Sequence, residues 1–167
     1  WTLQCHIDIA KAVWLDYCEC KMIDTIAREP LWRHLINYRC GTGHSVSFVG
    51  NVHEGPHALN GRNTTLMRPG MIVTDEPGVY ETDLVGIRIE NELVCVHKAD
   101  NQYGTFLGFE PIMFVPIATS PIVPGVLDKD EIAWLNNYHR QVFEKLAPRL
   151  NDEERDWLAK KCAAIGC

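Results

Sequence analysis

Residues 70–96 read GMIVTDEPGVYETDLVGIRIENELVCV, and their pattern decides the fold of the chain. Apolar and polar residues alternate over 70–76 and again over 86–96, as they do in strands that bury one face. Pro77 and Gly78 open a turn or loop between the two stretches. The sequence therefore predicts two strands that pair as an antiparallel hairpin, with one face covered by other parts of the chain.

Two glutamates lie inside these strand-like stretches, although carboxylates are rarely buried without a partner. Glu76 comes just before the turn and Glu90 shortly after it, so antiparallel pairing can bring them together on one face. His44 follows two glycines in GTGH, where the backbone can bend and present the ring, and His53 lies nine positions later in NVHEGP. One histidine and two carboxylates that converge are suitable ligands for Mn, Zn, Co or Fe(II).

Spacing alone leaves other interpretations of these residues open. Glu90 and Arg88 can form a cross-strand ion pair or a solvated face, and His44 can be a hydrogen-bonded loop histidine. A serine or cysteine nucleophile has less support, because the sequence has no GxSxG elbow and no cysteine in a nucleophile motif. The seven cysteines include no CxxC pair, which favours free thiols in a reducing cytosol over a zinc knuckle or a disulfide framework.

Helical periodicity precedes the hairpin. Apolar residues recur at helical spacing over 5–14 and over 19–36, where Pro30 is expected to interrupt the second helix. The stretch 40–63 is rich in Gly, Ser, His and Asn and is predicted to be a loop that carries polar chemistry.

A third strand and further helices follow the hairpin. Residues 106–117 are predicted to form an edge or irregular strand, because prolines break them. Asp128 with Glu131, and Asn151 with Glu154, have the spacing of capping boxes that begin helices. The order of helices, strands and helices, without βαβ alternation, predicts the α+β class.

Composition excludes several classes of protein. The 167 residues are 46% hydrophobic and 23% charged, which is typical of a folded globular domain. A net charge of −6 argues against a nucleic-acid partner. No apolar run approaches the ~20 residues that span a bilayer, and the start is not of the signal-peptide type, so no membrane partner and a cytoplasmic location are expected.

Three motifs taken together resemble one enzyme family: GTGHSVSFVGNVHEGP, GMIVTDEPGVYE and GIRIENELV. They are similar to the C-terminal half of the catalytic domain of Xaa-Pro aminopeptidase (aminopeptidase P) of the large three-domain type. The resemblance implies half of a pita-bread fold, as in creatinase and methionine aminopeptidase, with antiparallel strands and flanking helices. It assigns residues 1–121 to the metallopeptidase domain and 122–167 to a helical C-terminal extension.

The resemblance also implies a reaction and a metal centre. Family members remove the N-terminal residue before proline, so the expected partner is a peptide with proline at its second position, cleaved by a metal-bound hydroxide. The implied metal ligands are His44, Glu76 and Glu90, the last bridging two ions. Manganese is the first expectation for both ions, with zinc or cobalt as alternatives.

Three further residues take catalytic roles by the same resemblance. His53 matches a histidine that hydrogen-bonds the substrate or the tetrahedral intermediate. Arg88 and Tyr80 match positions that brace the metal ligands.

The resemblance is incomplete at the metal centre. The two aspartate ligands of the family lie upstream of the stretch that matches CHIDIAKAVW, with which this sequence nearly begins. The chain is therefore expected to be an incomplete portion that holds at most one weakly bound ion, and self-association or a homodimer is expected through an exposed sheet edge. Cys40 also stands where many relatives have a histidine.

Two alternative functions are kept. The chain is either a non-catalytic module that binds a peptide or protein through a reused pita-bread fold, or a related hydrolase such as a prolidase-like dipeptidase. The missing aspartates and Cys40 favour the module, whereas NVHEGP and WLNNYH favour aminopeptidase P over prolidase.

Overall fold

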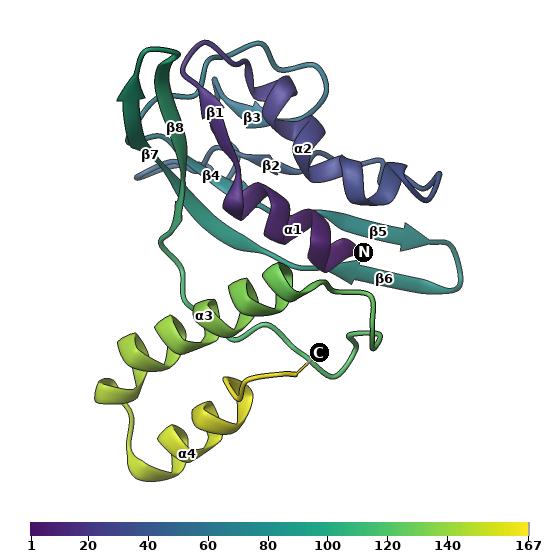
Figure 1. Cartoon of the computed structure of the whole chain (residues 1–167), viewed down its shortest axis with the longest axis vertical. Helices are drawn as coiled ribbons and strands as arrows, with labels where there is room; N and C mark the ends of the chain where they lie inside the picture. The colour runs from purple at the N-terminus through teal and green to yellow at the C-terminus, as the bar shows by residue number, and fades with distance from the viewer. Residues whose placement is uncertain (167) are drawn as a thin grey trace. The chain divides into compact units, whose positions relative to one another are not determined.

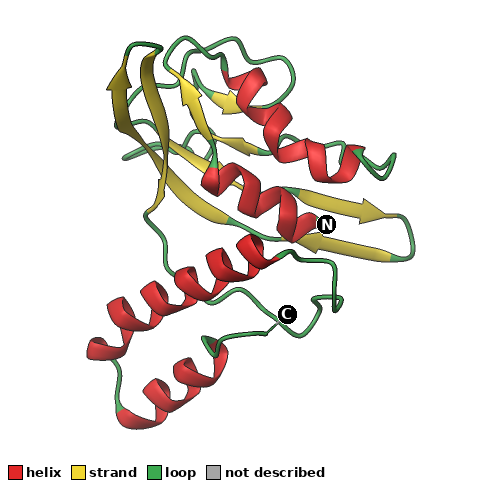
Figure 2. Cartoon of the chain, viewed as in Figure 1, coloured by secondary structure: helices red, strands yellow, loops and turns green. Residues whose placement is uncertain are grey.

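The computed structural model of the chain describes residues 1–166, which separate into two compact units. The first unit is Trp1–Met113, and the second begins at Phe114. Figure 2 shows that the strands belong to the first unit and that the second contains only helices and loops. The α+β class is confirmed. The division at 121/122, which rests on the family's domains, stays a prediction.

The first unit is built on an antiparallel sheet with the strand order β1-β8-β7-β4 (Figure 1). The strands are β1 (Val13–Leu15), β4 (Ile72–Asp75), β7 (Asn91–Asn101) and β8 (Gly104–Pro111). The prediction of an edge strand over 106–117 is wrong, because β8 lies between β1 and β7. The prolines do not disturb the pairing, since Pro111 is the last residue of the strand and Pro116 lies beyond it.

The predicted hairpin is confirmed, but it is longer than the sequence indicates. The segment PGVYETDLV, predicted to be a turn or loop, contains β5 (Gly78–Glu81) and the start of β6 (Val85–Arg88), which pair with each other. The turn itself is confined to 82–84. The strands extend into this segment because its β-branched and aromatic side chains favour strands, and this preference outweighs the turn preference of Pro-Gly at the start of β5.

The hairpin has a gap in its ladder where the two glutamates lie. β4 pairs with β7 up to Asp75↔Asn91, and β5 pairs with β6 from Gly78↔Arg88. The register is the same on both sides of the gap, so Glu76 and Glu90 occupy facing positions between the two ladders. Neither residue belongs to a strand.

Two helices cover the sheet. α1 (Thr2–Lys11) ends earlier than the helix predicted over residues 5–14, because Val13–Leu15 joins the sheet as β1. α2 (Cys20–Trp32) runs through Pro30, which lies in its last turn, so the predicted interruption there is wrong. The core between the helices and the sheet includes Ile9, Trp14, Ile23, Ala27, Leu59, Met67, Val73, Leu93, Leu107 and Phe109.

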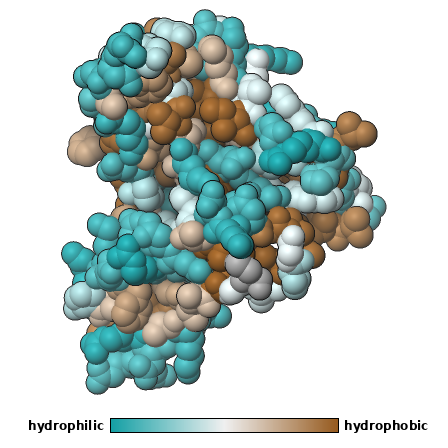
Figure 3. Space-filling model, in the orientation of Figure 1, coloured by the Kyte–Doolittle hydropathy of each residue, from teal (hydrophilic) through white to brown (hydrophobic). Residues whose placement is uncertain are grey.

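The segment predicted to be loop-rich is mostly irregular. It contains a short antiparallel pair, β2 (Gly43–His44) with β3 (Ala58–Leu59). Phe48 and Val49 are fully or largely exposed in the loop between these strands. Figure 3 shows that apolar residues of the visible face lie among polar ones.

The second unit contains α3 (Lys129–Leu146), the short 3-10 helix η1 (Ala147–Arg149) and α4 (Asp152–Lys161). Both predicted capping boxes are present, at Asp128 and at Asn151. Their helices pack through Tyr138, Val142 and Leu158. None of the described helices is both long and apolar enough to cross a membrane.

Candidate metal and peptide site

The predicted ligands His44 and Glu76 lie in contact at the gap in the hairpin. His44 Nε2 is 3.0 Å from Glu76 Oε1, and the two side chains are 18% and 13% exposed. The contact depends on the close approach of β2 to β4. Gly43 makes this approach feasible, because a Cβ there would lie 1.7 Å from the carbonyl oxygen of Thr74. This is a position that only glycine can occupy without displacing the strand.

The hydrogen bonds of the His44 ring show what the pair can hold. His44 Nδ1 lies 3.0 Å from the carbonyl oxygen of Ser45, which can only accept, so Nδ1 is a donor. In the neutral ring, Nε2 then carries a lone pair that faces the carboxylate of Glu76. Such an arrangement is favourable only when a proton or a cation lies between the two atoms.

Arg88 lies on the other side of Glu76, and Tyr80 contacts Arg88. Arg88 Nη1 forms an ion pair with Glu76 Oε2 and also donates to the main-chain oxygen of Glu76 at 3.2 Å. Arg88 Nε donates to Tyr80 Oη at 2.7 Å, a hydrogen bond that raises the pKa of Arg88 above its ordinary value. The guanidinium therefore stays cationic, and the structure places Arg88 against Glu76 and Tyr80 against Arg88.

His53 lies beside His44. The two rings are 4.0 Å apart between centroids and meet edge to face. His53 is exposed, so its ring can contact a ligand that enters from solvent.

Glu90 does not complete a three-residue ligand group. Over the residues that the structure describes, no three His, Cys, Asp or Glu side chains lie together so as to hold a metal ion. The expected convergence of His44, Glu76 and Glu90 is therefore not seen. The physical reason is that the carboxylate of Glu76 already accepts from Thr74 and Arg88, while Glu90 is exposed at the facing position.

His44 Nε2 and Glu76 Oε1 can supply two of the ligand atoms of one divalent ion. Two ligands that bind an ion at about 2.1 Å and at a right angle are about 3 Å apart, which matches the separation of His44 Nε2 and Glu76 Oε1. A nitrogen and a carboxylate oxygen suit the borderline ions Mn, Zn and Co. A dinuclear centre needs more ligands than this pair supplies.

A buried network behind the site could not be recognised in the sequence. On α2, Arg28 donates to Asp24 at 2.8 Å and to the carbonyl oxygens of Tyr38 and Cys40 at 2.8 and 2.9 Å. The hydroxyl of Thr42 donates to Asp24, and the carbonyl oxygen of Thr42 accepts from the main-chain nitrogen of Glu76 at 2.7 Å. The only sequence signal was the i, i+4 spacing of the Asp24–Arg28 pair on a helix.

A second buried pair lies directly before Glu76. His6 Nδ1 of α1 is 3.1 Å from Asp75 Oδ2, and neither side chain is exposed. Burial raises the pKa of Asp75 to about 6, against the opposing effect of His6. The pair ties α1 to the end of β4.

The thiol of Cys40 also reaches the site. Its Sγ lies 3.5 Å from the carbonyl oxygen of Gly78 and 3.9 Å from Arg88 Nη2. Cys40 thus contacts the same guanidinium that braces Glu76.

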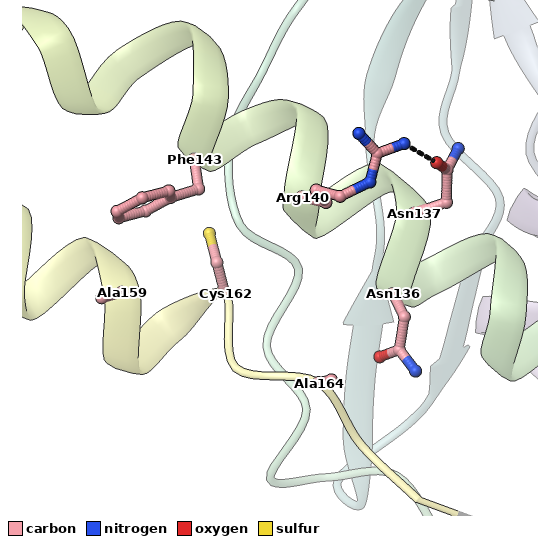
Figure 4. A pocket seen from close by; sticks show the side chains of 7 residues that line it. All are labelled: Asn136, Asn137, Arg140, Phe143, Ala159, Cys162 and Ala164. Atoms are coloured by element: carbon pink, nitrogen blue, oxygen red, sulfur yellow. Dashed lines mark hydrogen bonds between the residues drawn. The ribbon is translucent and has the colours of Figure 1, made fainter.

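The second unit has a cavity of its own, of about 560 Å³ (Figure 4). It is lined by Asn136, Asn137, Arg140, Phe143, Ala159, Cys162 and Ala164. Burial raises the pKa of Cys162, so this thiol stays protonated. None of the predicted site residues lines the cavity.

The curled antiparallel sheet with flanking helices, and a histidine and a carboxylate held in contact, define part of a pita-bread metallopeptidase fold. Comparison with protein families agrees with this class. The family described as metallopeptidase family M24 matches residues 1–97, and the C-terminal region of peptidase M24 matches residues 105–165. The chain belongs to the M24 metallopeptidase family.

Several relatives are named as aminopeptidase P or as Xaa-Pro aminopeptidase. Aminopeptidase P2 of Arabidopsis thaliana is 43% identical over 93% of this chain and 23% of its own length. A probable Xaa-Pro aminopeptidase P of Coprinopsis cinerea is 40% identical over 98% of this chain and 28% of its own length. The chain thus spans about a quarter of the length of the curated relatives that it matches.

A solved structure supports the same relationship. The X-prolyl aminopeptidase of Caenorhabditis elegans, described as a cytosolic enzyme with a di-nuclear active site, superposes with a TM-score of 0.89 at 37% identity. The match covers 98% of this chain and 28% of that one. The fold and the family are therefore confirmed.

Proposed function

We propose that the chain supplies part of the active site of a metal-dependent Xaa-Pro aminopeptidase, which removes an N-terminal residue that precedes proline. The observation that carries this proposal is the contact of His44 with Glu76 in a chain of the M24 family. The proposed substrate is a peptide with proline at its second position. A cytoplasmic location is proposed because the Caenorhabditis elegans relative is described as cytosolic.

His44 and Glu76 would hold one divalent ion, and Glu90 would approach it from the facing position of the hairpin. We propose manganese first, with zinc or cobalt as alternatives. Such an ion would polarise the scissile carbonyl and lower the pKa of bound water. Because no third ligand joins the pair in the described residues, we expect this chain to hold at most one weakly bound ion.

The other site residues act on the ligands and on the substrate. Arg88, held by Tyr80, fixes one carboxylate oxygen of Glu76 and leaves the other to face His44. The exposed ring of His53 is proposed to donate a hydrogen bond to the substrate carbonyl as negative charge develops on it.

A graft into a longer relative tests this function. This chain would replace the matching 28% of the Caenorhabditis elegans X-prolyl aminopeptidase, and the chimaera would be assayed with an Xaa-Pro-Pro tripeptide and manganese. We expect metal-dependent release of the first residue. His44→Ala and Glu76→Ala should abolish it, whereas His34→Ala and Glu110→Ala, at exposed positions, should not. A folded chimaera that stays inactive with saturating manganese would contradict the proposal.

Two alternatives are decided by related measurements. The absence of a three-ligand group in the described residues favours a non-catalytic module that binds a peptide or protein. No manganese binding by the chain, with retained affinity for an Xaa-Pro peptide, would support that module. Faster turnover of Xaa-Pro dipeptides than of longer peptides by the chimaera would instead indicate a prolidase-like dipeptidase.

A further inference from the structure

We infer that Thr74 is a positioning residue that holds the side chains of His44 and Glu76 in one arrangement, and that divalent-ion binding at this pair depends on its hydroxyl. The dependence of ion binding on Thr74 rests on the function proposed above. The positioning itself can be measured without a metal.

Three contacts connect these residues in a closed ring. The main-chain nitrogen of His44 lies 2.9 Å from Thr74 Oγ1, and Thr74 Oγ1 lies 2.8 Å from Glu76 Oε1. His44 Nε2 closes the ring at 3.0 Å from the same carboxylate oxygen. One hydroxyl therefore links the backbone of the histidine to the carboxylate that its ring faces.

The direction of each hydrogen bond follows from the chemistry of the groups. The main-chain N–H of His44 can only donate, so Thr74 Oγ1 accepts there. The ionised carboxylate of Glu76 can only accept, so the same hydroxyl donates its proton to it. The position thus requires a group that donates and accepts at one atom, which threonine and serine supply and valine does not.

The fold fixes the hydroxyl in this place. Thr74 lies on β4 and Glu76 directly follows the strand, and because the two are two residues apart along an extended chain, their side chains point to the same side. The close passage of Gly43 brings the backbone of β2 within reach of Thr74. Thr74 is 3% exposed, so little water competes for its hydrogen bonds, and its β-branched side chain has few rotamers.

The ring has a consequence for ion binding. An ion between His44 and Glu76 binds more tightly when both ligand side chains are already in place, since ordering them on binding costs conformational entropy. Hydrogen-bond partners of metal ligands typically contribute about 10- to 100-fold in metal affinity. Loss of the Thr74 hydroxyl would also leave the N–H of His44 without its acceptor.

Three variants of the full chain test the inference. Thr74→Val keeps the shape and removes the hydroxyl, and Thr74→Ser keeps the hydroxyl. Thr25→Val is the matched control, because the hydroxyl of Thr25 bonds only a carbonyl oxygen on the exposed side of α2. Manganese affinity would be measured from the paramagnetic resonance signal of the free ion, and the His44 ring would be observed by NMR without metal.

The inference predicts that Thr74→Val weakens manganese binding at least about tenfold and shifts the NMR signals of the His44 ring. Thr74→Ser and Thr25→Val should leave the signals in place and the affinity within about threefold. A folded Thr74→Val variant with wild-type affinity and unchanged ring signals would overturn it. If Thr74→Val does not fold, Thr74→Ala removes the same hydroxyl without adding bulk, and the same results apply.

The two proposals fail in different ways. A wild-type chain that binds no manganese at millimolar concentration contradicts the proposed metal site. The NMR measurement then decides the positioning role alone: ring signals that shift in Thr74→Val and not in Thr74→Ser support it, and signals that stay unchanged in both refute it.

Discussion

The substitution Gly43→Ala tests whether the close approach of β2 to β4 builds the site. A Cβ at this position would lie 1.7 Å from the carbonyl oxygen of Thr74 and 2.7 Å from its carbonyl carbon. These atoms belong to the backbone of a paired strand and cannot rotate away. Restoring an ordinary carbon–oxygen contact of about 3.3 Å requires β2 to move by about 1.6 Å.

The expected cost follows from what this movement breaks. It separates the main-chain nitrogen of His44 from Thr74 Oγ1, now at 2.9 Å, and the nitrogen of Glu76 from the carbonyl oxygen of Thr42, now at 2.7 Å. Each hydrogen bond contributes about 1 kcal/mol, and overpacking adds about 1–3 kcal/mol. We expect Gly43→Ala to lower the free energy of unfolding of the first unit by about 3–5 kcal/mol.

Urea denaturation, followed through NMR signals of β4 and β7, reports on the first unit alone. Gly61→Ala is the matched control, since nothing lies within 4 Å of a Cβ at that position. The control should change the free energy of unfolding by no more than about 0.5 kcal/mol. Equal denaturation midpoints for the two variants, with unchanged signals from the His44 ring, would refute the close-approach argument.

Three further predictions concern buried groups. Arg28→Met leaves the carboxylate of Asp24 buried without its ion-pair partner, so urea denaturation should show a free energy of unfolding lowered by about 3–5 kcal/mol. Arg33→Met breaks an exposed pair and should lower it by less than about 1 kcal/mol. Equal losses in the two variants would contradict the role of the network. Burial lowers the pKa of His139, so the unfolded chain binds more protons than the folded one, and the stability of the second unit should fall as the pH drops below about 6.5. Thermal unfolding of the His139→Gln variant should lose this pH dependence. A variant with the same pH profile as the wild type would refute the assignment. Burial raises the pKa of Cys5 to about 12 and that of Cys95 to about 11. Mass spectrometry after alkylation at about pH 8 should therefore find both thiols unmodified in the folded chain and modified after denaturation. Rapid labelling of the folded chain would contradict their burial.

The sequence was informative wherever local patterns determine the structure. Period-two alternation located the strands around Glu76 and Glu90. The capping-box spacing, in which a glutamate follows Asp128 or Asn151 by three residues, located two helix starts. Both signals depend on residues that are close together in the chain. The pairing of His44 with Glu76 as ligands was predicted from motifs that resemble a known family, since spacing alone left a hydrogen-bonded loop histidine as an open alternative.

The remaining features depend on pairing that a local pattern does not encode. The Pro-Gly pair at 77–78 indicated a turn, although the strands continue past it and turn only at 82–84. The interior place of β8 is set by its pairing with β1, which is distant in sequence. Thr74 and Arg28 looked like ordinary strand and helix residues, because their partners come from other elements.

The central claim is that His44 and Glu76 bind one divalent ion together. Pulsed electron paramagnetic resonance of manganese bound to the full chain measures this directly, since it detects coupling to a ligand nitrogen. We predict a histidine nitrogen coupling in the wild type that is lost in His44→Ala and kept in His97→Ala, with weaker binding in Glu76→Ala. Failure to bind manganese, or a nitrogen coupling that persists without His44, would contradict the claim.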